Sequence, residues 1–404
     1  MSSHRGTVEG FFLAGQNLVW CKIGASLFAS SIGIVRFLTL AGSGASAGVV
    51  IGAIEWNAVF FLCALGWIFS PIYIKAEVVT MPEFLRKRFC SRRIQFLLSF
   101  LYLFFYIFHM LLVEICIGSM YLRLIWGLDT YLITIFLLLI AGACTITGGL
   151  VTVAYTDTLH ATMISTGSVL VMTFALRKVG GFRNIVDNYF TAKPNITSEG
   201  NWTAKPECYT PRQDSLHIFR DVKTGDIPWP GLIFGVPIIS LFHWCNNQIF
   251  VQRALAGKDM NHVKGGCVFC GFLKLLTMFS IVIPGMISRI LFPDQIACVV
   301  PSECEKHCGN KSNCSFLAYP LLILELLPLG LRGFIMSTLW AALISSLTSA
   351  FNCSSTIFTM DIYTQMRPMA TEKELMVTGS MYAYFPVFHF ETPFCPAYLY
   401  ETLT

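Results

Sequence analysis

The chain has 404 residues and a formal net charge of +5; 55% of its residues are hydrophobic and only 13% are charged. Soluble globular domains carry about 25% charged residues, and a membrane β-barrel would show short segments of alternating polarity instead of long apolar runs. The composition therefore excludes both classes and predicts an all-α, polytopic membrane protein embedded in a lipid bilayer.

Apolar runs long enough to cross a bilayer recur along the whole chain. A hydrocarbon core of roughly 30 Å needs about 20 consecutive apolar residues in a helix. Residues 316–327 are too short to cross and are expected in the membrane interface, whereas 376–404 are expected to form a tail of unclear structure. The predicted spans cover, in chain order, roughly 18–43, 47–75, 95–122, 130–149, 151–177, 231–252, 267–292 and 331–360.

Loop charge predicts the orientation of these spans. The loop after the second span contains "FLRKRFCSRR" (84–93), and loops rich in Lys and Arg face the cytoplasm. Alternation then places the loops at 178–230 and 293–316 outside. The loop after the sixth span, which begins at Arg253, falls inside, as do the N-terminus and the C-terminal tail. We therefore expect a multi-pass protein of the plasma membrane.

The two outer loops contain the features expected of an extracellular compartment. Glycosylation sequons can be modified only on the lumenal side, and the candidates are Asn195, Asn201 and Asn310. The second outer loop also contains four cysteines, which could form two disulfides or a zinc site. The oxidising compartment and the absence of a CxxC pair favour disulfides, with three pairings possible. These cysteines are Cys298, Cys304, Cys308 and Cys314.

Several ionisable side chains lie within the predicted spans. Placing each of these side chains in a bilayer costs on the order of 3 kcal/mol or more, so each is expected to have a structural or functional role. Arg36, Glu55, His243 and Lys274 come from four different spans and are expected either to line a polar cavity between helices or to form structural ion pairs, for instance Glu55 with Arg36. The remaining ionisable residues in the spans are Lys22, His109, Glu114, Asp157 and His160.

The middle of the first span predicts an interrupted helix. "SSIGIV" (30–35) places two serines and a glycine at mid-membrane, where a broken helix frees backbone carbonyl oxygens that can bind a cation. The eighth span offers a hydroxyl cluster in "ALISSLTSAFNCSST", where Ser345 and Ser346 supply the oxygen ligands that a small cation prefers. Alternatively, these hydroxyls bond back to their own helix or hold neighbouring helices together.

The order of short motifs resembles the sodium/glucose cotransporter family of sodium:solute symporters. The resemblance covers about residues 6–375, nearly the whole chain. It implies a leucine-transporter-like bundle of two inverted five-helix repeats with an incomplete second repeat, as in a shortened member of the family. The motifs include "FFLAG", "SLFAS", "PIYIK", "VVTMPEFLRKRF", "TITGGL", "YTDTL", "TGDIPWPG", "PGMISRIL", "ACVVPSECEKHC" and "SSLTSAFN".

The resemblance implies a division of the chain into four parts. Residues 1–177 correspond to the first repeat and 178–230 to an extracellular glycosylated loop. Residues 231–363 correspond to three helices of the second repeat, interrupted by the cysteine-rich loop 293–316. Residues 364–404 are the expected cytoplasmic tail.

The resemblance also implies positions for the sodium and sugar sites. Sodium is expected to bind to Ala29 and Ile32 in the break of the first span and to Ala342, Ser345 and Ser346 in the eighth. Asp157 matches a family aspartate near that site, where its charge would favour entry of the cation. The expected sugar-binding positions are Ser31, Arg36, Glu55, Ser240, His243, Trp244 and Lys274.

Three sugar-binding positions depart from the family pattern. Ser31, Arg36 and His243 stand where the family usually has asparagine, histidine and tyrosine. Arginine adds a permanent charge that a neutral sugar does not require, so the identity of the sugar stays open.

The function implied by the resemblance is sodium-coupled symport of a glucose-like hexose across the plasma membrane by alternating access. The expected partners are a sodium ion as coupling ion, a hexose and the bilayer, with no further cofactor and no nucleic acid. The alternative is a non-transporting sugar sensor, or a truncated and inactive family member. An enzyme is not expected, because the chain has no nucleophile elbow, P-loop or zinc-spaced motif.

Overall fold

The computed structural model describes residues 7–311 and 313–382, and these are helical almost throughout. In these residues the only strands are β1 (Ser198–Glu199) and β2 (Trp202–Thr203), a short antiparallel pair in the loop after the fifth span. This confirms the predicted all-α class.

Each predicted span coincides with an apolar helical segment. In the described part of the chain, five helices are long and apolar enough to cross a membrane, or six with one bent pair. Two further apolar helices, Thr130–Ile146 and Gly231–Asn246, are shorter. The spans are formed, in chain order, by α2 (Trp20–Ser31) with α3 (Ile34–Ala47); α4 (Val50–Ala64), η2 (Leu65–Phe69) and α5 (Ser70–Lys75); α7 (Arg92–Phe104), η3 (Phe105–Leu111) and α8 (Leu112–Trp126); α9 (Thr130–Val179), which forms two spans; η4 (Gly231–Gly235), α12 (Val236–Leu241) and η5 (Phe242–Asn246); α14 (Met260–Thr277), η6 (Met278–Val282) and α15 (Ile283–Leu291); and α19 (Leu329–Ile357), η8 (Phe358–Tyr363) and α20 (Thr364–Met366).

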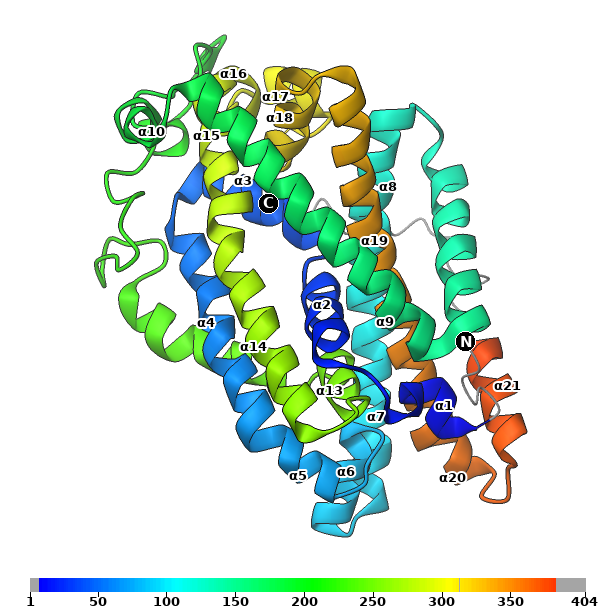
Figure 1. The fold of residues 1–404 in the computed structure, drawn as a ribbon. Helices are drawn as coiled ribbons and strands as arrows, with labels where there is room; N and C mark the ends of the chain where they lie inside the picture. The colour runs from blue at the N-terminus through cyan, green and yellow to red at the C-terminus, as the bar shows by residue number, and fades with distance from the viewer. Residues whose placement is uncertain (1–6, 312, 383–404) are drawn as a thin grey trace.

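Shorter helices connect the spans, and most of them gather at the two ends of the bundle. Figure 1 shows α10, α16 and α17 at one end and α5 and α6 at the other. The first end carries the sequons and the cysteine-rich loop, and the second carries the basic loop, as the predicted orientation requires. The connecting elements are α1 (Val8–Phe12), η1 (Ala14–Gln16), α6 (Met81–Phe89), α10 (Phe182–Tyr189), α11 (Pro206–Tyr209), α13 (Gln248–Leu255), α16 (Pro293–Ile296), α17 (Pro301–Cys308), η7 (Ser315–Leu317), α18 (Ala318–Leu326) and α21 (Glu372–Tyr382).

The fourth and fifth spans are two legs of α9 that meet at Gly149. This glycine has φ of 54° and ψ of −157°, a backbone conformation that residues other than glycine rarely adopt. A Cβ atom there would also lie 2.6 Å from the backbone oxygen of Phe11. The chain therefore turns back on itself without a loop, and the two legs diverge from this point (Figure 1).

Side-chain caps fix where several helices begin. The Thr80 hydroxyl accepts a hydrogen bond from the backbone N–H of Glu83 at the start of α6, and the Asn247 side chain accepts one from Ile249 at the start of α13. Asp259 accepts a hydrogen bond from the backbone N–H of His262 at the start of α14, which lowers the pKa of Asp259. Such caps satisfy amide groups that have no partner within the helix.

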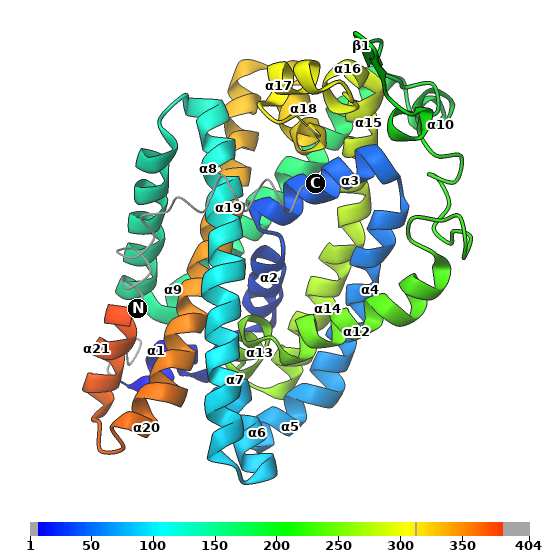
Figure 2. The ribbon, with the colours of Figure 1, turned by 180° about the vertical axis from the view of Figure 1, so that it is seen from behind.

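The core of the bundle is the first half of the broken span, α2, enclosed by α9, α14 and α19 (Figures 1 and 2). Small residues allow the close approach of membrane helices. A Cβ on Gly24 of α2 would lie 2.6 Å from the backbone oxygen of Gly266 in α14, so only glycine fits at this crossing. The segment of α19 from Ala341 to Ile357 is buried along its whole length.

The short apolar stretch 316–327 forms helix α18, which packs against α3 and α15 and buries Tyr319, Leu322 and Ile323. The ring centroids of Tyr319 and Phe37 lie 4.7 Å apart. Most of the expected tail, 383–404, lies outside the described residues.

Candidate functional site

The first span is broken as predicted. The first half, α2, ends at Ser31, and the second half, α3, begins at Ile34. The axes of the two helices are bent by 64° relative to each other. Between them Gly33 is extended, with φ of −70° and ψ of 171°. Residues at this break therefore leave the helical hydrogen-bond pattern at the centre of the bundle, which is the arrangement that exposes backbone oxygens to a bound ion.

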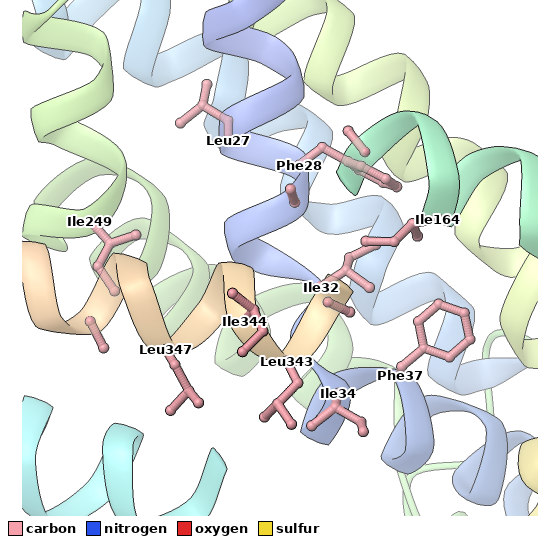
Figure 3. Close-up of a cluster of buried hydrophobic side chains, with 14 of the residues drawn as sticks. Leu27, Phe28, Ile32, Ile34, Phe37, Ile164, Ile249, Leu343, Ile344 and Leu347 are labelled. Atoms are coloured by element: carbon pink, nitrogen blue, oxygen red, sulfur yellow. The ribbon is translucent and has the colours of Figure 1, made fainter. Parts of the chain in front are cut away.

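The eighth span lies directly against this break. Figure 3 shows Ile32 and Ile34 beside Leu343 and Ile344 of α19, and a Cβ on Gly33 would lie 2.9 Å from both Cβ and Oγ of Ser346. The structure therefore places Ser346 at the break, and all five predicted sodium-binding positions are buried: Ala29, Ile32, Ala342, Ser345 and Ser346.

The hydroxyls of the two predicted sodium-binding serines in α19 have different hydrogen-bond partners. Ser345 Oγ donates to Asp157 Oδ1 at 2.6 Å, across to α9. Ser346 Oγ donates to the backbone oxygens of Ala342 and Leu343, at 3.2 and 3.0 Å. The first hydroxyl therefore joins two spans, and the second shows the backward bonding that the sequence left open as an alternative.

Asp157 is the centre of a fully buried polar network. Its Oδ2 accepts a hydrogen bond from Ser26 Oγ at 2.6 Å and lies 3.2 Å from Nη2 of Arg253. The same guanidinium donates through Nε to Ser26 Oγ at 2.7 Å and through Nη2 to Ser349 Oγ at 2.6 Å. The network ties α2, α9, α13 and α19 together beside the break.

Arg253 does not lie where the sequence predicts. The sequence places it in the inner loop after the sixth span, whereas α13 turns back into the bundle and the Arg253 side chain has no exposed surface. One signal indicates that a partner must exist: a carboxylate within the fifth span, Asp157, needs a compensating positive charge. The nearest basic residues in sequence gave no indication of which one supplies it.

The second polar cluster joins three of the predicted sugar-binding residues. Arg36 donates to Glu55 Oε1 from Nε at 2.8 Å and from Nη2 at 2.5 Å. Lys274 Nζ donates to Glu55 Oε2 at 2.7 Å. Glu55 and Lys274 are buried, whereas the Arg36 side chain is 41% exposed. The ion pair that the sequence offered as an alternative is therefore present, and both carboxylate oxygens of Glu55 are engaged.

Aromatic residues form one side of this cluster. The Trp244 ring lies 5.4 Å from Lys274 Nζ and 5.2 Å from the His243 ring, measured to ring centroids. Ser240 precedes them by one helical turn in α12 and is buried. The Ser31 hydroxyl donates to the backbone oxygen of Phe28 at 2.7 Å, so it closes the end of α2.

The loop at 293–316 contains the predicted disulfides. Cys298 pairs with Cys304 and Cys308 pairs with Cys314, which selects one of the three pairings that the sequence allowed.

The sequons of the outer loops have different surroundings. The side-chain amide of Asn195 donates to Asp294 Oδ2 at 2.9 Å, whereas Asn201 is exposed in the turn between β1 and β2. Asn310 lies just after α17 in the cysteine-rich loop.

Comparisons with known proteins agree with this architecture. The sequence profile of the "Sodium:solute symporter family" matches residues 11–387. Sodium/glucose cotransporter 1 of Ovis aries is 57% identical over 381 residues, which are 94% of this chain and 57% of that protein. Solute carrier family 5 member 4B of Mus musculus is 52% identical over 380 residues, which are 94% of this chain and 58% of that protein.

A more distant relative and a solved structure complete the comparison. Sodium/glucose cotransporter 2 of Rattus norvegicus is 48% identical over 390 residues, which are 95% of this chain and 58% of that protein. The chain thus spans little more than half the length of these relatives. The outward-open, substrate-bound structure of a Na⁺-coupled sialic acid symporter has a TM-score of 0.79 at 20% identity, covering 99% of this chain and 78% of the other, which confirms the predicted fold. The chain belongs to the sodium:solute symporter family.

Proposed function

We propose that this chain performs sodium-coupled symport of a glucose-like hexose across the plasma membrane by alternating access. The observation that carries the proposal is the contact between the break in the first span and Ser346 of the eighth, with Asp157 bonded to Ser345 next to it. Relatives whose names state sodium/glucose cotransport, at 48–57% identity, give the sugar class.

The sodium ion would bind where the two halves of the first span separate. Its ligands would be the backbone oxygens of Ala29, Ile32 and Ala342 with the hydroxyls of Ser345 and Ser346, all hard oxygen donors. Ser346 would turn from its own helix toward the ion. Binding there would fix the angle between α2 and α3, and the membrane potential would contribute about 2.3 kcal/mol per charge per 100 mV.

The sugar would bind at the second cluster. Glu55 would accept hydrogen bonds from sugar hydroxyls, Lys274 would donate to them, and Trp244 would pack against the ring. Because both oxygens of Glu55 are engaged, Arg36 would have to release Oε1 before a hydroxyl could bind there. Ser31, Ser240 and His243 would complete the walls, and sodium and sugar would each raise the affinity for the other.

The repeat organisation follows from the same proposal. Residues 1–177 and 231–363 would move against each other around the fixed sites. The loops at 178–230 and 293–316 would lie outside, and the N-terminus and the tail after 364 would lie in the cytoplasm. The bilayer would surround the exposed apolar faces of the spans.

One observation favours a second candidate, a sugar sensor that does not transport. Arg36 fills hydrogen-bonding positions on Glu55 that a transported sugar would use, so the site would then respond to sugar without moving it. Uptake of labelled α-methylglucoside by cells expressing the full chain, with sodium or with choline, separates the two. Uptake that requires sodium supports the symporter, and a sugar-evoked sodium current without uptake supports the sensor.

A further inference from the structure

Glu114, in α8 of the third span, is a membrane carboxylate without a compensating charge. Its Oε2 atom is buried and has no hydrogen-bond partner. In the part of the chain that the structure describes, no basic side chain forms an ion pair with it, because Arg36 and Lys274 bond to Glu55 and Arg253 bonds to Asp157. An unpaired charge at this depth is strongly unfavourable, so the carboxyl must be neutralised either by a bound proton or by a cation from outside the chain.

The carboxylate lies at the break in the first span. A Cβ on Gly33 would overlap Glu114 Oε1, and the same Cβ would lie 2.9 Å from Ser346 Oγ. The carboxyl of α8 and the hydroxyl of α19 therefore meet at Gly33. The φ of Gly33 is −70°, which any residue adopts. Glycine is needed here because the carboxylate occupies the space of a side chain.

Asp157, the other carboxylate beside the break, is already compensated. Its oxygens accept hydrogen bonds from Ser345 and Ser26, and the guanidinium of Arg253 supplies a full positive charge. The uncompensated negative charge next to the predicted ion ligands is therefore that of Glu114.

We propose that Glu114 is the charged ligand of the sodium ion that binds at the break, so that the ion lies between this carboxylate and the hydroxyl of Ser346. This inference rests on the proposed function and adds to the expected ligand set a residue from a third span. A carboxylate oxygen is a hard ligand suited to a small cation. With the ion bound, the pair is close to neutral and tolerates enclosure in a medium of low dielectric constant. Without the ion, the buried charge of Glu114 opposes that enclosure.

Sodium-dependent thermal stability of the purified full chain tests the inference without requiring transport. The unfolding temperature is measured as NaCl replaces choline chloride at constant ionic strength, since an ion that binds the folded state stabilises it. For Glu114→Gln, the sodium concentration that gives half of the stabilisation should rise by about 10-fold or more. Glu325→Gln, which removes the same charge from an exposed position of α18, should keep the wild-type curve.

Two further variants keep the test decisive if Glu114→Gln folds poorly. Glu114→Asp keeps the charge and should retain a sodium response, weakened by less than Glu114→Gln. Gly33→Ala should displace the intact carboxylate and weaken the sodium response as Glu114→Gln does.

Two results overturn the inference, and they are distinguishable. If wild type responds to sodium and Glu114→Gln and Gly33→Ala respond equally well, Glu114 does not bind the ion and holds a proton instead, while the proposed symport stands. If wild type itself shows no response to sodium, the sodium-coupled function fails together with the inference.

Discussion

The guanidinium of Arg253 lies 3.2 Å from the carboxylate of Asp157, and neither side chain has exposed surface. This pair joins the short helix after the sixth span to the fifth span, next to the serines of the eighth. A buried ion pair contributes little net stability by itself, but removal of one partner leaves a buried charge uncompensated. The pair therefore fixes the positions of α9 and α13 relative to each other beside the break.

Arg253→Met should lower the free energy of unfolding by about 3–5 kcal/mol, because Asp157 would stay buried without its partner. Thermal unfolding of the purified chain measures the effect. Arg183→Met, at an exposed position of α10, is the matched control and should change little. The double variant Arg253→Met/Asp157→Leu should recover part of the loss. A single variant as stable as the control would contradict the role assigned to the pair.

Arg36→His should strengthen sugar binding, because it frees Glu55 Oε1 to accept a hydrogen bond from a sugar hydroxyl. The concentration of α-methylglucoside that gives half-maximal uptake at saturating sodium should fall about 5-fold, a difference near 1 kcal/mol, typical of one hydrogen bond. Arg183→His controls for loss of an exposed arginine. An unchanged or higher half-saturating concentration would mean that Arg36 does not compete with the sugar.

Glu55→Ala should weaken sugar binding more than sodium binding, since Glu55 bonds to Arg36 and Lys274 and not to the groups at the break. Sodium and sugar activation curves of uptake, each at a saturating level of the other ligand, measure the two effects separately. Equal losses in both curves would show that Glu55 acts on the whole bundle and not on the sugar.

The cysteine-rich outer loop should contain the linkages Cys298–Cys304 and Cys308–Cys314. Mass spectrometry of unreduced proteolytic peptides identifies which cysteines are joined. Each bridge closes a short loop, for which the chain-entropy model gives roughly 2–3 kcal/mol of stabilisation. Crossed linkages, or zinc bound in stoichiometric amount to free thiols, would contradict this pairing.

The sequence predicted the features that depend on local chemistry. The break at Ser31 to Ile34 followed from small and hydroxyl residues at mid-membrane, and the spans followed from their apolar length. The positions of Arg253 and Glu114 could not be predicted, because both depend on how distant helices pack. In the sequence, Arg253 has the position of a basic residue that flanks a span. The place of Glu114 at the break is visible only in the structure, where its carboxylate occupies the space that a side chain at Gly33 would fill.

The sodium dependence of α-methylglucoside uptake in wild type and Ser346→Ala tests the central claim most directly. If the break in the first span and the eighth span bind the coupling ion together, wild-type uptake should require sodium and Ser346→Ala should need about 10-fold more sodium for half-maximal uptake. Ser337→Ala, on the same helix and away from the break, should match wild type. Uptake that is the same in choline as in sodium, or a Ser346→Ala curve identical to wild type, would contradict the account.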